Sequence, residues 1–288
     1  MFIRTKSKIL LARIAQAGIV FGRRIAGLGP TVDCRRADAN WRLDLNEGID
    51  FSIFLLGSFE QSAMAVYRRL IKNGDVVIDI GANIGSHTLP LAVRVGDAGR
   101  VVAIEPTAWA FEKLTLQLSL NPDLSARVTP LQAMLLADSK SSVPEAIPSS
   151  WPLATPAEAH SEHGGVAKST RGARAITLDE LVAELGLARV DFVKLDVDGF
   201  ELEVLRGAKQ TLATFAPTIL FEHAPYTLVE KGYEPDEMTR LLLDAGYRFR
   251  DLSGAMFDGD GRRLPDVLAG AGINIIASRT PAAESQRA

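Results

Sequence analysis

Short apolar runs and longer mixed segments alternate along the chain, and this pattern predicts strands that alternate with helices. The apolar runs are typical of buried strands and lie at 76–80, 100–106, 126–135, 190–199 and 218–223. Apolar residues with helical spacing lie at 59–72, 87–95, 108–120 and 200–215. Strands that alternate with helices form a mostly parallel sheet through right-handed crossovers. The expected fold class is therefore α/β, with helices on both faces of the sheet.

The two ends of this region differ from its middle. A helix is predicted at 235–245. The strands predicted at 246–252 and 273–279 have no clear helix between them, so we expect them to pair antiparallel at an edge of the sheet. Ahead of the first core strand, the segment 40–56 predicts two short strands around a turn at 46–48.

The segment 139–173 has no periodic pattern. Ser, Pro, Ala, Gly and Thr make up 22 of its 35 residues, which predicts a loop or lid inserted in the domain. A loop of this length inside a compact domain is usually functional or disordered. It contains His160 and His163, two of the four histidines. A helix is expected to follow, because Thr177 and Glu180 form the pattern of a capping box.

The turn after the strand at 76–80 has the sequence DIGANIG, with the spacing Asp79-x-Gly81-x-x-x-Gly85. It lacks the GxGxxG pattern, in which two glycines let a pyrophosphate approach the backbone. Asp79 would repel a phosphate, and it suits a cationic or hydroxyl-rich ligand. Glu105 ends the next strand, where a carboxylate reaches a ribose in this topology. The two acids favour a positively charged nucleoside, S-adenosylmethionine, over NAD.

With further motifs, this turn makes the chain similar to the class I S-adenosylmethionine-dependent methyltransferases, and within them to the FkbM family. The further motifs are GSFE at 57–60, AIEP at 103–106, TLDEL at 177–181 and KLDVDGFELEVLRG at 194–207. The likeness covers residues 41–279. It implies a Rossmann-like, seven-stranded sheet with an antiparallel last strand. It also implies methyl transfer, commonly to oxygen, so we expect O-methylation of a sugar, a glycolipid or a polyketide-like small molecule.

The resemblance implies a set of cofactor-binding residues: Glu60, Asp79, Gly81, Ala82, Asn83, Gly85, Glu105, Pro106, Gln132 and Asp196. In this set, Glu105 would take the ribose hydroxyls, Gln132 would face the adenine, and Asp196 would lie near the methyl group. Two features depart from the family pattern. Asp198 stands where the family often has Glu, and the insertion at 139–173 carries no familiar motif, so the identity of the acceptor stays open.

Methyl transfer to a hydroxyl also requires removal of its proton, and two residues are candidate catalytic bases. Asp196 alternates with Lys194 on one face of its strand, and His223 ends the next strand along the chain. His87, near the turn, is expected to pack against or support the site. Further acids close by in the sequence are Asp198, Glu201 and Glu222. Together, Asp196, Asp198, Glu222 and His223 would allow a divalent metal ion that holds a diol, but no metal ligand is assigned.

Composition and charge restrict the setting of the protein. With a net charge of −3, the chain has no overall electrostatic attraction to nucleic acid. The single cysteine, Cys34, excludes an intrachain disulfide and a zinc finger, and it fits a reducing, cytoplasmic setting. No apolar run reaches the length of about 18 residues that predicts a transmembrane helix. The expected partner is a small-molecule or glycan acceptor.

The segment 1–36 differs from the methyltransferase domain expected at 37–288. It holds eight basic residues against one acid, Asp33, for a net charge of +7. This predicts an amphipathic helix on an anionic membrane surface, a helix docked on the domain, or a loose tail. Two alternatives to a methyltransferase stay open: an NAD(P)-dependent oxidoreductase, and an inactive membrane-surface scaffold with the same fold.

Overall fold

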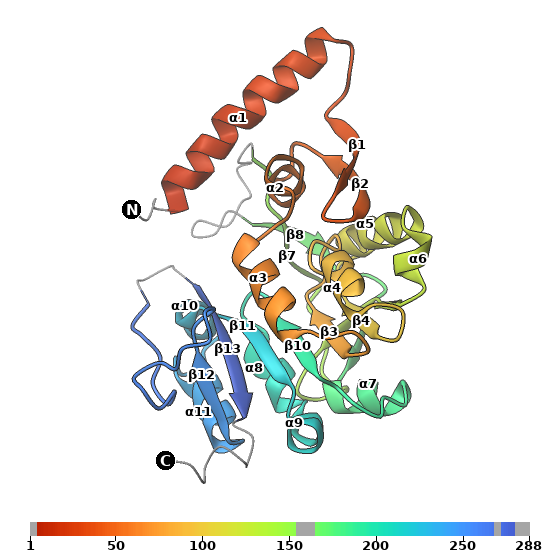
Figure 1. Cartoon of the computed structure of the whole chain (residues 1–288). Helices are drawn as coiled ribbons and strands as arrows, with labels where there is room; N and C mark the ends of the chain where they lie inside the picture. Colours follow the sequence, from red (N-terminus) through yellow and green to blue (C-terminus); the bar gives the residue numbers. More distant parts are fainter. Residues whose placement is uncertain (1–4, 154–164, 268–271, 280–288) are drawn as a thin grey trace.

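A seven-stranded sheet forms the centre of the structure. The computed structural model describes residues 5–153, 165–267 and 272–279 (Figure 1). In spatial order, the strands are β12 (Tyr247–Arg250), β13 (Ile273–Arg279), β11 (Thr218–His223), β10 (Phe192–Leu195), β3 (Val76–Ile80), β4 (Arg100–Ile104) and β5 (Val128–Leu131). Neighbours are parallel except for the two pairs that β13 makes, with β11 and β12. The predicted α/β class and the antiparallel last strand are confirmed.

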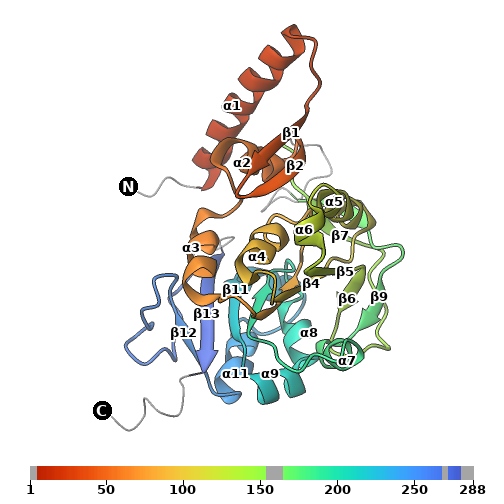
Figure 2. The same cartoon turned by 45° about the vertical axis from the view of Figure 1, so that its right-hand side comes forward.

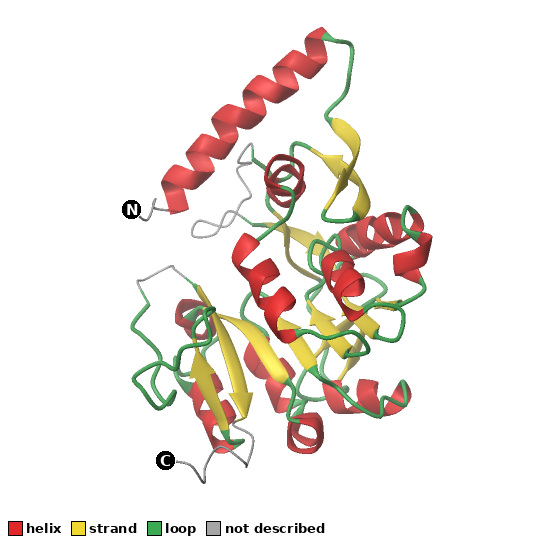
Figure 3. Cartoon of the chain, viewed as in Figure 1, coloured by secondary structure: helices red, strands yellow, loops and turns green. Residues whose placement is uncertain are grey.

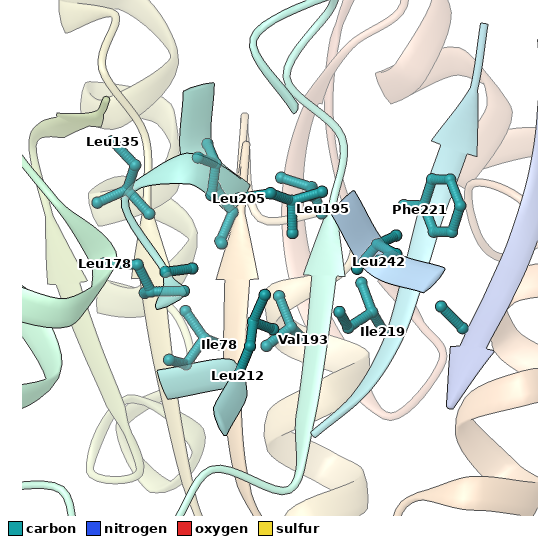
Figure 4. Close-up of a cluster of buried hydrophobic side chains, with 14 of the residues drawn as sticks. Ile78, Leu135, Leu178, Val193, Leu195, Leu205, Leu212, Ile219, Phe221 and Leu242 are labelled. Atoms are coloured by element: carbon teal, nitrogen blue, oxygen red, sulfur yellow. The ribbon is translucent and has the colours of Figure 1, made fainter. Parts of the chain in front are cut away.

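Side chains of the central strands alternate between two apolar cores, one on each face of the sheet. Ile78, Val193 and Ile219 face the first core (Figure 4). The helices of this core are α7 (Leu178–Glu184), α8 (Glu201–Arg206), α9 (Lys209–Phe215) and α11 (Glu237–Asp244). Val77 and Phe192 face the second core, which is formed with α3 (Gln61–Leu70), α4 (Thr88–Val95) and α5 (Ala108–Ser119). The helices therefore cover both faces, as predicted (Figure 2).

Two predicted elements are each divided in the structure. The helix expected at 200–215 is split at Gly207 into α8 and α9. Glycine is required at this break, because an added Cβ would lie 2.3 Å from the carbonyl oxygen of Leu136. The strand expected at 126–135 is split into β5 and β6 (Ala133–Leu135), and β6 pairs with β9 (Arg174–Ile176) outside the main sheet. The short helices α6 (Pro122–Ser125) and α10 (Pro225–Glu230) were not predicted.

The segment 40–56 contains one strand and one helix, so the prediction of two strands is wrong. The strands β1 (Thr31–Arg36) and β2 (Ala39–Asp44) form an antiparallel hairpin, and α2 (Gly48–Leu56) follows. A short apolar run does not distinguish a strand from a buried helix. The position of Asp50 favours the helix, because its buried carboxylate in the first turn accepts from the Asp44 amide at 2.8 Å and lies 3.1 Å from the Lys113 ammonium.

The insertion at 139–173 is not a structureless loop where the structure describes it. Its strands β7 (Ala146–Ser150) and β8 (Val166–Ser169) pair antiparallel. The amide of Gly48 donates to the carbonyl oxygen of Trp151 at 2.9 Å, so the end of β7 is attached to the start of α2. Proline and serine in β7 obscured the strand pattern. His160 and His163 lie outside the described residues.

The N-terminal helix α1 (Thr5–Ile25) lies along the outside of the domain (Figure 3). Ala12, Ala15 and Ile19 on α1 pack against a small core of buried residues: Leu45, Phe51 and Leu153. Of the alternatives predicted for the segment 1–36, docking on the domain is therefore observed for α1. No helix in the described part of the chain is long and apolar enough to cross a membrane.

The capping box before α7 gives a test of local stability. The Thr177 side chain accepts from the Glu180 amide at 3.1 Å, and the Glu180 carboxylate accepts from the Thr177 amide at 2.9 Å. Thr177→Ala removes one of these bonds, so we expect the free energy of unfolding to fall by about 0.5–2 kcal/mol in urea denaturation. In the control Thr115→Ala, an exposed helical threonine is replaced, and we expect little change. Equal losses in the two variants would contradict the capping role.

Candidate active site

The carboxyl ends of β3, β4, β10 and β11 surround a cavity of about 490 Å³. From β3 the chain continues to β4 and β5 on one side, whereas β10 and β11 extend the sheet on the other side. Sheets of this kind bind ligands at such a switch point. Six of the ten predicted cofactor residues line the cavity: Glu60, Gly81, Asn83, Glu105, Pro106 and Asp196.

Lys194 connects the turn after β3 to the end of β10. Its ammonium group donates to the carbonyl oxygen of Gly81 at 2.8 Å, and lies 3.6 Å from the Asp79 carboxylate and 3.4 Å from that of Asp196. Burial acts to lower the pKa of Lys194, but Asp196, Asp79 and Glu60 outweigh it and raise the pKa. The lysine is therefore a fixed cation at the floor of the cavity and does not act as a base.

Asp79 lies below the cavity and does not line it. Its side chain is fully buried, and the Thr88 hydroxyl donates to it at 2.6 Å. Burial raises the pKa of Asp79, while Lys194 and Thr88 favour its ionised form. The sequence predicts that Asp79 contacts the ligand. In the structure, the strand direction points the side chain at Lys194, which pairs with it in register, so Asp79 acts on the cavity through the lysine.

Glu105 lies at the end of the cavity nearest β4. Its carboxylate accepts from the Thr107 hydroxyl at 2.6 Å, from the Thr107 amide at 2.9 Å and from the Asn83 amide at 3.0 Å. Burial raises the pKa of Glu105, and these hydrogen bonds oppose that rise. A carboxylate oxygen accepts more than one bond, so this fixed group has capacity left for the hydroxyls of a ligand.

Gly81 brings two strand ends into very close approach. Its φ is +78°, and a Cβ added there would lie 1.8 Å from the carbonyl oxygen of Asp196. The left-handed conformation and the lack of space both require glycine. Two other predicted residues shape this turn without lining the cavity. The Ala82 amide donates to the carbonyl oxygen of Ile104 at 3.0 Å, and Gly85 packs against Leu114.

The other end of the cavity is strongly acidic. Glu60, Asp196, Asp198 and Glu222 line it. Burial, followed by the charge of Asp196, raises the pKa of Glu60 to about 7 and the pKa of Glu222 to about 8. Acids with raised pKa values lose a proton more easily when a cation binds beside them. This end of the cavity therefore favours a positively charged ligand.

A chain of polar groups leads from the second core to this acidic end. The Tyr67 hydroxyl and Nδ1 of His87 lie 2.8 Å apart, and Nε2 of His87 lies 3.7 Å from the Glu60 carboxylate. Burial lowers the pKa of His87 and raises that of Tyr67, so both groups are neutral. In the tautomer in which the hydroxyl donates to Nδ1, the histidine proton is on Nε2, on the side of Glu60. His87 lines the cavity, although the sequence indicated only a packing or supporting role.

Two predicted site residues lie away from the cavity. His223, a candidate base, is buried on β11, where successive side chains point to opposite faces, and Glu222 faces the cavity in its place. Gln132, predicted to face the adenine, donates its side-chain amide to the carbonyl oxygen of Arg171 at 2.9 Å. The sequence shows that both residues follow strands, but it does not show which way they point.

The hairpin of β7 and β8 supplies residues that no sequence motif indicated. Ile147, Ser149 and Trp151 line the cavity. The carbonyl oxygen of Ser149 accepts from the Asn83 amide side chain at 3.0 Å, and its hydroxyl lies 2.8 Å from that of Thr107. The inserted segment is thus attached to the same loops that hold Glu105. Asn274 on β13 was also not predicted, and its side chain donates to Glu60 at 3.3 Å.

Within residues 5–153, 165–267 and 272–279, no group of three or more His, Cys, Asp or Glu side chains is arranged to hold a metal ion. The acids at the cavity instead surround one lysine.

Comparison with known proteins identifies the family. Residues 79–249, more than half of the chain, match the methyltransferase FkbM domain. The chain belongs to this family. The hexuronic acid methyltransferase AglP of Haloferax volcanii is 30% identical to this FkbM-family protein over 186 residues, which are 65% of this chain and 69% of AglP. The methyltransferase sdnD of Sordaria araneosa is 28% identical, over 59% of this chain and 73% of sdnD.

A solved structure of methyltransferase FkbM from Methylobacillus flagellatus is 16% identical, with a TM-score of 0.43 over 72% of this chain and 44% of that one. As an FkbM-family member, the protein is an S-adenosylmethionine-dependent methyltransferase, and the oxidoreductase alternative is set aside. The cavity fits this cofactor: Glu105 suits the ribose hydroxyls, Gly81 leaves room for close approach, and the acidic end suits the sulfonium and ammonium charges.

The crowding at Gly81 predicts a specific loss of cofactor binding. We expect Gly81→Ala to bind S-adenosylhomocysteine at least about tenfold more weakly than the unchanged protein in calorimetry, since the Cβ would displace the end of β10. Gly186→Ala is the matched control, because Gly186 also has a positive φ but has no atom within 4 Å of an added Cβ. Circular dichroism checks that both variants fold. Equal affinities of the two variants would show that the close approach at Gly81 does not matter for binding.

Proposed function

We propose that the protein transfers the methyl group of S-adenosylmethionine to a hydroxyl oxygen on a sugar, a glycolipid or a polyketide-like small molecule. One observation carries this proposal. A single cavity contains a fixed carboxylate suited to a ribose at one end, Glu105, and a half-exposed carboxylate suited to accept a proton at the other, Asp196.

The cofactor part of the cavity has a defined arrangement in this proposal. Glu105 accepts the ribose hydroxyls, while Asn83 and Thr107 hold its carboxylate in place. Gly81 and Pro106 border the cofactor, and Asn83 holds the inserted hairpin beside it. Four residues of the predicted set act without direct contact, by shaping the turn or by holding a neighbour: Asp79, Ala82, Gly85 and Gln132.

The acceptor part has to align a hydroxyl and remove its proton. When bound, S-adenosylmethionine supplies an electrophilic methyl group. Asp196 would accept the hydroxyl proton as the oxygen replaces sulfur at the methyl carbon and the sulfur leaves as a neutral thioether, and Lys194 holds the Asp196 carboxylate in position at 3.4 Å. Such a base contributes about 10²–10⁴-fold to the rate. Alignment of the two reactants by the cavity walls supplies about 7–11 kcal/mol more.

Glu60 and His87 position the acceptor in this proposal. The neutral His87 presents the proton on Nε2 toward Glu60 and the cavity, and Tyr67 fixes that tautomer through Nδ1. Asn274 donates to the same carboxylate from β13. A hydroxyl bound at this end therefore meets both a donor and an acceptor, as a sugar hydroxyl requires.

The charge of the cavity favours a neutral acceptor. The relative AglP is named for a hexuronic acid, a sugar that carries a carboxylate. Here Glu60, Asp196, Asp198 and Glu222 line the end of the cavity where the acceptor would meet the sulfonium methyl group, with Lys194 already held by two carboxylates. An acidic sugar would be repelled by these groups, while an uncharged hydroxyl compound would not. We therefore place neutral sugars and their lipid conjugates ahead of sugar acids as acceptors.

The assignment of Asp196 as the base predicts a large loss of rate on substitution. In labelled-methyl transfer to a panel of neutral sugars, glycolipids and cell extracts, we expect Asp196→Asn to reduce the rate by about 10²–10⁴-fold. Asn keeps the size of the side chain and removes its ability to take a proton.

His223→Gln is the matched control, because His223 was the other candidate base and lies away from the cavity. It should transfer methyl groups at nearly the normal rate. Undiminished transfer by Asp196→Asn, or a comparable loss in His223→Gln, would show that the base is assigned incorrectly.

A further inference from the structure

Helix α1 has two apolar faces that point in opposite directions. The inner face packs on the domain through Ala12, Ala15 and Ile19. At 100° per residue, Ile14, Phe21 and Ile25 lie on the opposite side of the helix, and their side chains are 62%, 66% and 73% exposed. Leu28 follows, with 53% exposed. Docking on the domain explains the inner face and leaves the outer face without a described contact.

The outer face is open as well as apolar. Gly18 and Gly22 lie beside the stripe on α1, and an added Cβ at either position would meet no atom within 4 Å. An apolar stripe three turns long on a soluble surface marks an interaction site more often than an isolated exposed residue does. The stripe therefore indicates that a partner covers this face of the helix.

The charge around the stripe indicates what that partner is. No acid occurs before Asp33, whereas six basic residues do: Arg4, Lys6, Lys8, Arg13, Arg23 and Arg24. Arg24 is exposed, and Arg23 donates to the carbonyl oxygens of Gly29 and Thr31, which holds the end of α1 in place. A second copy of this face would bring two basic helices together, and like charges repel. An anionic surface would be attracted instead.

Helix α1 also borders the cavity. Arg13 lies on the flank of α1, between the inner and the outer face, and is one of the residues that line the cavity. Leu153, at the end of the inserted hairpin segment, both packs under α1 and lines the cavity. One wall of the cavity is therefore built by the same helix that carries the exposed stripe.

We propose that the outer face of α1 binds an anionic lipid membrane, with the helix lying in the plane of the membrane surface. The apolar stripe would enter the lipid, and the net positive charge of the segment would attract the anionic head groups. The cavity would then open beside the lipid surface. Among the acceptors named above, this placement favours a glycolipid, a choice that rests on the proposed function. The membrane contact itself does not depend on methyl transfer.

Sedimentation with vesicles tests the contact in the full chain without cofactor. We expect the protein to sediment with vesicles of phosphatidylcholine and phosphatidylglycerol in equal parts, and much less with phosphatidylcholine alone. The double variant Phe21→Glu, Ile25→Glu should partition at least about tenfold more weakly into the mixed vesicles, because two apolar anchors become anions. Added salt should weaken binding of the unchanged protein, since it screens the charges.

The matched control carries the same two charges elsewhere. Leu116 on α5 and Val229 on α10 are also exposed apolar residues, 36% and 55% exposed, and Leu116→Glu with Val229→Glu should sediment as the unchanged protein does. Failure to bind the mixed vesicles, or equal binding by the Phe21→Glu, Ile25→Glu variant, would overturn the proposal. The proposal would also be overturned if light scattering showed that the unchanged protein is a dimer and that the Phe21→Glu, Ile25→Glu variant is a monomer. Labelled-methyl transfer to a soluble acceptor, measured in parallel, reports on the proposed function separately.

Discussion

The buried ammonium group of Lys194 is the interaction on which the active site depends. It holds the turn after β3 through the Gly81 carbonyl oxygen and lies between the carboxylates of Asp79 and Asp196. Loss of this cation would leave the Asp79 carboxyl group without its opposite charge at a fully buried position, and removal of one partner of a buried pair costs about 3–5 kcal/mol. The same group thus stabilises the end of the sheet and positions the proposed base.

The remaining features of the site follow from the strands that meet there. Parallel strands place the ends of β3, β4, β10 and β11 at one edge, and the acids that end them gather in one cavity. Burial, followed by the charge of Asp196, raises the pKa values of Glu60 and Glu222. The inserted hairpin closes the cavity from the other side and contacts α1 through Leu153. Cofactor loops, acceptor wall and surface helix are therefore connected.

Patterns local in the sequence were predicted well, and orientations in space were not. The apolar runs and the capping box at Thr177 indicate their elements directly, and the motifs identify the family. The direction of a side chain at a strand end depends on register with its neighbours, so Asp79 and His223 were expected at the cavity and lie away from it. The hairpin in 139–173 is held by contacts to Asn83 and to the start of α2, which are distant in sequence.

The central claim is that the acidic cavity holds the positive charge of S-adenosylmethionine. Calorimetry in buffers of different ionisation enthalpy measures how many protons are released when a ligand binds. The comparison is between S-adenosylmethionine and S-adenosylhomocysteine, whose sulfur carries no charge. Glu60 and Glu222, with pKa values of about 7 and about 8, are partly protonated near neutral pH. A bound sulfonium favours their ionised forms, so S-adenosylmethionine should release more protons, and its affinity relative to S-adenosylhomocysteine should rise between pH about 6 and about 8. Equal proton release and a constant affinity ratio would contradict the account.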